Sequence, residues 1–247
     1  MTLQPITRDA PPLSGRAIAS QRWSELTFVH WRIDSAAVAP LLPAGLRPDE
    51  FDGSSWVGLI PFLLDRATLF GSAPVPYLGR FVELNVRLYA VDGQGRRGVL
   101  FRSLEASRLG AVAAARAAFN LPYFWSDTWM SSDADLRTYG SKRHGGGPRS
   151  SLTARIGHPV EATPLDDFLT ARWGMFTSLR GRTRFVPNEH PAWALRSATL
   201  MGLDDELVAA AGLPGIAGRE PDSVRFSHGV TTTFGRPVNE RPDKEKG

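Results

Sequence analysis

Cysteine is absent from this chain of 247 residues. Its absence excludes disulfide bonds, thiol nucleophiles, zinc–thiolate sites and iron–sulfur clusters. The five histidines are scattered without the spacing of a zinc motif, so no metal site is predicted. No G-x-S-x-G elbow, phosphate-binding loop or dinucleotide fingerprint occurs either, and we therefore predict no cofactor.

Lysine is nearly absent as well. Of the 29 basic residues, only Lys142, Lys244 and Lys246 are lysines. Lys142 lies beside a glycine-rich loop, and the other two lie in a polar C-terminal stretch. A Schiff-base lysine needs a desolvated site or a cationic neighbour that lowers its pKa, and none of the three is in an apolar setting. We therefore predict that the chain is not a lysine Schiff-base enzyme.

Long hydrophobic runs are missing. Residues 1–12 lack the apolar centre of a signal peptide, and no run reaches the length that spans a membrane. We expect a cytoplasmic protein with no membrane partner. The net charge is +4, but the basic residues are dispersed and form no stripe, so no nucleic-acid partner is predicted.

What the chain does contain is a series of short strand patterns. The clearest covers residues 81–91, where apolar residues alternate with Glu83, Asn85, Arg87 and Tyr89. This period of two predicts a strand with one apolar face. The other face has to meet water or a pocket.

Turn signals divide the remaining sequence into further short strands and a few helices. Other strands are expected near residues 21–33, 55–65, 99–104, 136–143, 150–156, 176–179, 183–187, 193–200 and 224–234, and helices near 34–42, 107–119, 163–173 and 204–211. The pattern predicts an α+β fold, mostly antiparallel, that closes into a β-barrel because so many hairpins would otherwise leave open edges. We predict a single barrel domain over residues 21–236, with a flexible N-terminal segment (1–20) and a disordered tail (237–247).

Two charged features are costly unless they are used. Arg116 projects from an apolar face of the helix expected at 107–119, and a buried guanidinium needs a partner, for which Glu83 and Glu105 are candidates. One interpretation is that Glu83, Arg87 and Arg116 line a cavity for a small carboxylate or carbonyl compound, because the arginine fork matches a carboxylate. The alternatives are a structural ion pair inside the sheet or a solvated strand face.

Aromatic and imidazole side chains mark two more segments. Residues 121–125 include Tyr123 and Trp125, which could supply a phenol and a ring wall to a pocket, although a core position explains such rings more simply. Residues 188–193 place His190 beside an acid, which could serve acid–base chemistry. An exposed turn is the interpretation that we favour for this second segment.

Five short motifs carry a family resemblance. They are residues 26–31 (LTFVHW), 41–46 (LLPAGL), 56–61 (WVGLIP), 83–87 (ELNVR) and 120–123 (NLPY). Together they resemble the uncharacterised YqjF-like family, a branch of the acetoacetate-decarboxylase-like superfamily, over about residues 22–234. The resemblance implies a cone-like antiparallel barrel with a central cavity, a fold that is often assembled into oligomers, so a homo-oligomer is a possible state.

The resemblance also implies what this chain has lost. In the decarboxylases a helical arginine is followed by a glycine-x-proline motif and then two lysines. Arg116 falls at the position of that arginine, and Asn120 and Pro122 match the glycine and the proline. Tyr123 and Phe124 stand where the two lysines would be. The resemblance thus implies that the pocket is kept and the covalent chemistry is lost.

Two functions remain open from the sequence. The first is a small-molecule pocket protein that lacks the Schiff-base lysine, either a noncovalent enzyme of the lyase or hydratase type or a binder. In that hypothesis Glu83, Tyr123 and Arg116 are catalytic, and Arg87, Asn85, Trp125 and His190 bind the substrate. The second is a ligand sensor or interaction module without turnover, and the sequence does not decide whether the protein is an enzyme.

Overall fold

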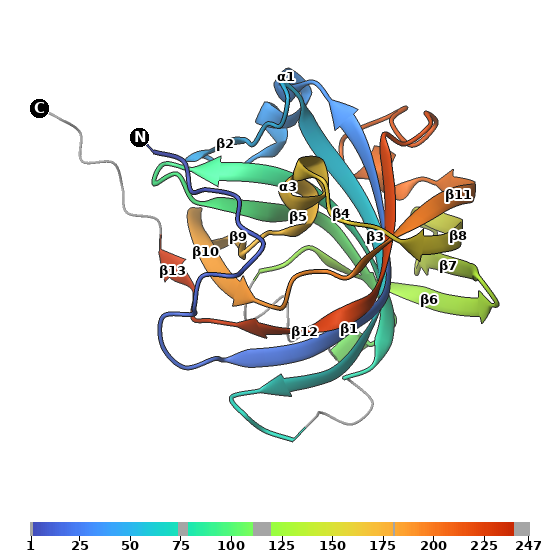
Figure 1. Cartoon of the computed structure of the whole chain (residues 1–247), viewed down its shortest axis with the longest axis horizontal. Coiled ribbons are helices and arrows are strands. Elements are labelled where there is room, and N and C mark those ends of the chain that lie inside the picture. The colour runs from blue at the N-terminus through green and yellow to red at the C-terminus, as the bar shows by residue number, and fades with distance from the viewer. Residues whose placement is uncertain (1, 74–78, 111–119, 180, 240–247) are drawn as a thin grey trace, which may run out of the picture.

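The structure, a computed structural model, describes residues 2–73, 79–110, 120–179 and 181–239. Its strands are β1 (Ala19–Ile33), β2 (Leu46–Pro48), β3 (Ser55–Leu69), β4 (Phe81–Asp92), β5 (Arg97–Ala106), β6 (Tyr123–Asp133), β7 (Leu136–Arg143), β8 (Arg149–Pro159), β9 (Gly174–Leu179), β10 (Arg182–Glu189), β11 (Leu195–Asp205), β12 (Ser223–Phe234) and β13 (Val238–Asn239). The short helices are α1 (Ser35–Val38), η1 (Ala39–Leu41), α3 (Pro164–Thr170) and α4 (Leu207–Ala210). The predicted barrel, mostly antiparallel and with few short helices, is confirmed (Figure 1).

The strands form one sheet that closes on itself twice. The larger ring has nine strands, in the order β5, β6, β7, β8, β11, β12, β1, β3 and β4, after which β4 pairs with β5. A smaller ring forms because β5 also pairs with β9, β9 pairs with β10, and β10 pairs with β12. Strands β12, β1, β3, β4 and β5 therefore form a wall that both rings share.

This shared wall is buried on both of its faces. One face of β4, with Leu84 and Val86, packs inside the nine-strand ring against Val29, Tyr139 and Leu152, all fully buried. Burying a Val or Leu side chain contributes about 1.5–3 kcal/mol, so this interior is a dry core. The other face of β4 points into the smaller ring. The double burial also accounts for the buried apolar side chains on both faces of β1, such as Phe28 and Val29.

Several local signals act as expected. At the start of α3 the Thr163 hydroxyl accepts a hydrogen bond from Asp166 N, and the Asp166 carboxylate accepts one from Thr163 N. This capping box, with Pro at the first position, confirms the predicted start of the helix. The helix ends at Thr170, before the expected Trp173. Asp52 and Gly53, which precede β3, both have positive φ, a conformation that Asp-Gly pairs adopt in tight turns.

One strand was missed and the end of another was misplaced. Strand β6 was not anticipated, because its polar residues hide the alternation that identifies a strand. Strand β11 was expected to end near Leu200, yet it pairs with β8 as far as Asp205. The ladder hydrogen bonds outweigh the helix-capping signal of Asp204, and the Asp205 carboxylate instead accepts from Val208 N at 2.9 Å. Of the helix expected at 107–119, residues 111–119 lie outside the described residues.

The N-terminal residues lie against the smaller ring. Gln4 N donates to Gly95 O at 2.9 Å, and the indole of Trp173 donates to Thr7 O at 2.9 Å. The flexibility expected for this segment stays a prediction. At the other end β13 pairs with β10, so regular structure extends to Asn239, slightly beyond the predicted domain, and residues 240–247 lie outside the described residues.

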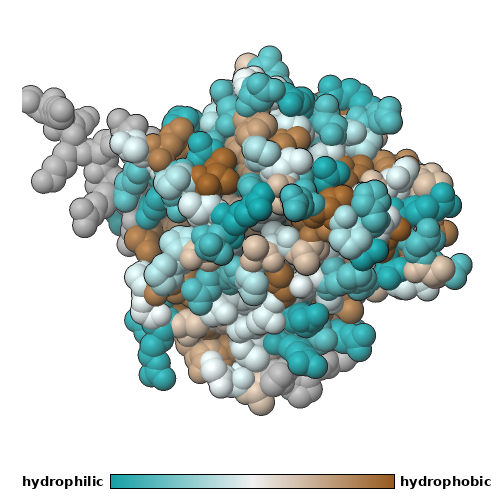
Figure 2. Space-filling model, in the orientation of Figure 1, coloured by the Kyte–Doolittle hydropathy of each residue, from teal (hydrophilic) through white to brown (hydrophobic). Residues whose placement is uncertain are grey.

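Within the described part of the chain, no helix is long and apolar enough to cross a bilayer. On the face shown in Figure 2, hydrophilic and hydrophobic side chains are interspersed.

Candidate functional site

A cavity lies inside the smaller ring, on the far side of the shared wall from the dry core. The volume that water-sized molecules can occupy inside it is about 80 Å³. Its lining combines the polar face of β4 with side chains from β1, β3, β5, β9, β10 and the segments that follow α3 and β10. Because the nine-strand ring is filled by side chains, the cavity is displaced from the centre of that ring.

The polar row of β4 lines this cavity as a group. Glu83, Asn85 and Arg87 all contribute to its wall, which joins three of the residues that the sequence singled out. Glu83 and Asn85 are 3% and 4% exposed. The predicted polar strand face is therefore neither solvated nor part of the dry core. The Oδ1 atom of Asn85 is buried and has no hydrogen-bond partner.

Glu83 and Tyr123 form a hydrogen-bonded pair at one end of the row. The Tyr123 hydroxyl donates to Glu83 Oε2 at 2.8 Å, because β6 pairs with β5 in a register that brings Tyr123 beside this wall. Burial raises the pKa of Glu83 to about 8, although the bond from Tyr123 opposes the shift. Burial and the adjacent Glu83 also raise the pKa of Tyr123 well above its ordinary value. Near neutral pH both groups therefore hold their protons.

Arg87 occupies the opposite end of the row. Its Nε donates to the Tyr89 hydroxyl at 3.0 Å, and its Nη2 donates to the main-chain oxygen of Leu169 at 3.0 Å. Tyr89 in turn donates to Leu169 O and contacts His30 Nε2 at 2.7 Å. Among the described residues no carboxylate lies within ion-pair distance of Arg87. The hydrogen-bond partners of this guanidinium are thus neutral oxygen atoms, and it also lies over the rings of Phe28 and Tyr89.

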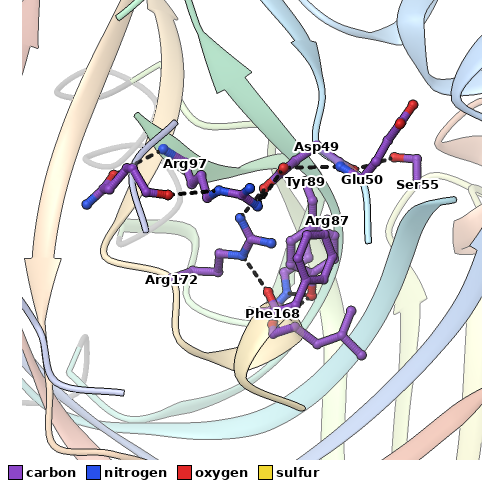
Figure 3. A network of polar contacts seen from close by, with 10 residues as sticks. Asp49, Glu50, Ser55, Arg87, Tyr89, Arg97, Phe168 and Arg172 are labelled. Carbon is purple, nitrogen blue, oxygen red and sulfur yellow. Dashed lines mark hydrogen bonds and ion pairs between the residues drawn. The ribbon is translucent and has the colours of Figure 1, made fainter. Parts of the chain in front are cut away.

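A second arginine, which the sequence analysis missed, lies at the same end (Figure 3). Arg172 follows α3 and is 5% exposed, and its Nη1 donates to Asp49 Oδ2 at 2.5 Å. Asp49 also accepts two hydrogen bonds from Arg97 Nη1, at 2.8 and 3.0 Å. One buried carboxylate therefore serves two guanidinium groups. The Nη2 atom of Arg172 is buried without a hydrogen-bond partner.

His190 is buried in the cavity wall among indole rings. It is 7% exposed, so the interpretation of its segment as an exposed turn was wrong. Its ring centroid lies 4.6 Å from that of Trp173 and 4.9 Å from that of Trp193. Nδ1 lies 2.7 Å from Pro191 O, and since a carbonyl only accepts, Nδ1 carries the proton. Burial, with a smaller effect from Arg87, lowers the pKa of His190 to about 4, which leaves a neutral imidazole.

Trp125 does not line the cavity, and its prediction as a substrate-binding residue was wrong. It is 44% exposed and packs on His144, with ring centroids 4.0 Å apart. Trp125 and Tyr123 point to the same side of β6, because side chains alternate along a strand. Tyr123 lines the cavity, whereas Trp125, two residues further along the strand, lies outside its lining. Arg116 lies outside the described residues.

The described residues that line the cavity include no lysine. Lys142 is exposed on β7, away from the cavity lining, and the other two lysines lie outside the described residues. Glu105, one candidate partner of Arg116, lies on the opposite face of the wall and pairs with Arg143 at 2.5 Å. Across the described residues no group of three or more potential ligands is placed to hold a metal ion.

The double ring, with a pocket inside its smaller ring, is a barrel of the acetoacetate-decarboxylase-like fold. The structure is similar to acetoacetate decarboxylase from Legionella pneumophila subsp. pneumophila str. Philadelphia 1, with a TM-score of 0.67 and 13% identity over 94% of this chain and 92% of that one. It is also similar to the enduracididine biosynthesis enzyme MppR complexed with pyruvate, with a TM-score of 0.62 and 14% identity over 91% of each chain.

Sequence comparison identifies the family within this fold. Residues 20–231 match the family model DUF2071, described as an uncharacterized conserved protein, and the chain belongs to this family. It is 32% identical over 185 residues to the uncharacterized protein YqjF of Bacillus subtilis (strain 168), covering 73% of this chain and 76% of that protein. The resemblance to the YqjF-like family is therefore confirmed.

Proposed function

We propose that the cavity binds a small carboxylate or carbonyl compound without forming a covalent bond to it. The observation that carries this proposal is Arg87, whose guanidinium reaches the cavity wall with the Tyr89 hydroxyl and the Leu169 carbonyl as its described partners. An arginine held this way has donors left for a carboxylate, which the planar fork can bind through two parallel hydrogen bonds.

The balance of charge at this end supports an anionic ligand. Arg87, Arg97 and Arg172 carry three positive charges, and Asp49 is the carboxylate within ion-pair distance of two of them. Burying an uncompensated charge costs several kcal/mol. A bound carboxylate that accepts from Arg87 and from the unpartnered Nη2 of Arg172 would remove most of this cost.

The other end of the cavity supports proton transfer. Glu83 keeps its proton near neutral pH and is hydrogen-bonded to Tyr123, so either hydroxyl can donate to a carbonyl or leaving-group oxygen. A structural neighbour complexed with pyruvate holds a ligand of the proposed chemical class. Because lysine is missing from the described lining, the proposed chemistry is acid–base chemistry on a noncovalently bound ligand.

The test is a thermal-shift screen of carboxylates against their matched carboxamides. Carboxylates are expected to raise the melting temperature, and the carboxamides to have little effect, because a ligand that binds only the folded state stabilises it. Arg87→Met should abolish the shift, whereas Arg47→Met, a change at an exposed arginine of β2, should preserve it. Equal stabilisation by both series, or by the Arg87→Met protein, would contradict the proposal.

Turnover separates the enzyme from the sensor. Each stabilising carboxylate is incubated with the protein, and the small molecule is then analysed by mass spectrometry. If the original protein changes the mass of the ligand or isomerises it, and the Glu83→Gln protein does not, the result supports an acid–base enzyme. A ligand that stays unchanged supports a sensor without turnover. A borohydride-trapped adduct on the protein would contradict noncovalent binding in either case.

A further inference from the structure

The two polar ends of the cavity lie far apart on a single strand. Glu83 and Arg87 are four residues apart on β4, which places their Cα atoms about 13 Å from each other. Each side chain is also held by a different element. Glu83 contacts Tyr123 of β6, whereas Arg87 contacts the carbonyl of Leu169 in α3. A carboxylate as short as pyruvate cannot contact both ends at once.

Apolar side chains line the cavity between these ends. Ile60 of β3 pairs with Asn85, and Phe62 pairs with Glu83, so both lie beside the polar row. Leu26 and Phe28 of β1 continue the same wall. These four side chains are no more than 3% exposed and belong to one hydrophobic cluster. The middle of the cavity therefore favours an apolar ligand body.

One polar atom interrupts this apolar section. Asn85 lies halfway between Arg87 and Glu83, about 7 Å from each along the strand. Its buried Oδ1 has no hydrogen-bond partner, which is costly for an atom removed from water. A hydroxyl group on a ligand can pair with either atom of the amide, whichever way the amide is turned. The row thus presents an anion site, a hydrogen-bonding position and a neutral acid, in that order.

We infer that the ligand is an elongated monocarboxylate with an apolar chain of about six to ten carbons and a hydroxyl or carbonyl group near its middle. Its carboxylate binds Arg87 and Arg172, its central group binds Asn85, and its far end reaches Glu83 and Tyr123. This inference rests on the proposed function, because it needs the carboxylate at Arg87. It adds the length of the ligand and the position of its polar group.

The test uses straight-chain carboxylates from acetate to dodecanoate, with binding measured by titration calorimetry below their aggregation concentrations. Each added methylene that enters the apolar section should tighten binding about three- to fourfold, and the gain should stop once the chain fills the cavity. Decanoate with a mid-chain hydroxyl should bind more tightly than decanoate, and Asn85→Leu should remove that advantage. An affinity that does not rise with chain length, or that is highest for acetate, would overturn the inference.

Cavity variants separate this inference from the proposed function. Ile60→Phe fills the middle section, so it should weaken decanoate at least tenfold and leave acetate within about twofold, an internal comparison within one protein. Phe62→Trp serves if the first variant does not fold. Suppose that Arg87→Met abolishes the binding of every carboxylate, but that affinity for the original protein does not depend on ligand length. Then only the inference about ligand length fails. If the Arg87→Met protein binds all the carboxylates as tightly as the original protein does, both the proposed function and this inference fail.

Discussion

Glu83 should make the stability of this protein fall as pH rises. Its pKa is raised from 4.5 to about 8 in the folded protein, so the unfolded chain releases the proton first. Between these two pH values the folded state binds more protons, and the free energy of unfolding decreases by up to about 1.4 kcal/mol per pH unit. The whole effect amounts to about 5 kcal/mol as an upper figure, and it levels off above pH 8.

Glu83→Gln isolates this effect, because glutamine resembles the protonated acid and does not titrate. The difference in unfolding free energy between the variant and the original protein should be small at pH 5. At pH 8.5 the variant should be the more stable protein by several kcal/mol, since the original then carries a buried charge. Urea unfolding at both pH values measures this difference in unfolding free energy. The other titrating groups are the same in both proteins, so their contributions cancel.

The control is Glu220→Gln, a change at an exposed glutamate. Its difference from the original protein should stay constant with pH, because an exposed carboxyl has nearly the same surroundings in both states. If Glu83→Gln behaved in the same way, with a difference constant to within about 0.5 kcal/mol, the argument that burial keeps Glu83 protonated would be refuted. The proposed role of Glu83 as an acid would then lose its basis.

Two further changes test the framework around the cavity. Asp49→Asn leaves Arg97 and Arg172 without their shared carboxylate and should cost about 3–5 kcal/mol in urea unfolding, whereas Asp52→Asn, at an exposed ion pair, should cost less than about 1 kcal/mol. Gly229→Ala should cost more than about 2 kcal/mol, because its φ is +117° and the added Cβ would lie 1.9 Å from a carbonyl oxygen of β1. A thermal melting temperature unchanged by the Gly229 substitution would show that this contact can relax.

Part of the candidate site was visible in the sequence. The alternation in β4 identified Glu83, Asn85 and Arg87 as a polar face opposite an apolar one, and this face does line the cavity. Tyr123 was singled out through the family resemblance and lies hydrogen-bonded to Glu83. These predictions succeeded because strand alternation is a local property that a short stretch of sequence records.

Other residues gave no local signal. Arg172 follows a helix in a segment without a recognisable motif, and only the tertiary fold brings it to Asp49, which lies 123 residues earlier in the chain. Trp125 has the same character as Tyr123 in sequence, but the smaller ring covers one and leaves the other in solvent. Exposure at these positions depends on which strands close over them, and strand pairing over long sequence distances leaves no pattern in either segment.

The sequence by itself determined most of the strands and their buried faces, the scarcity of lysine and the membership of a family, because each of these depends on residue identity and spacing. The tertiary structure decided where the cavity lies. Two short pairings, β5 with β9 and β10 with β12, close the smaller ring and turn one polar strand face into the wall of a pocket. Contacts of this kind join residues that are distant along the chain, so their position is fixed only when the whole sheet closes.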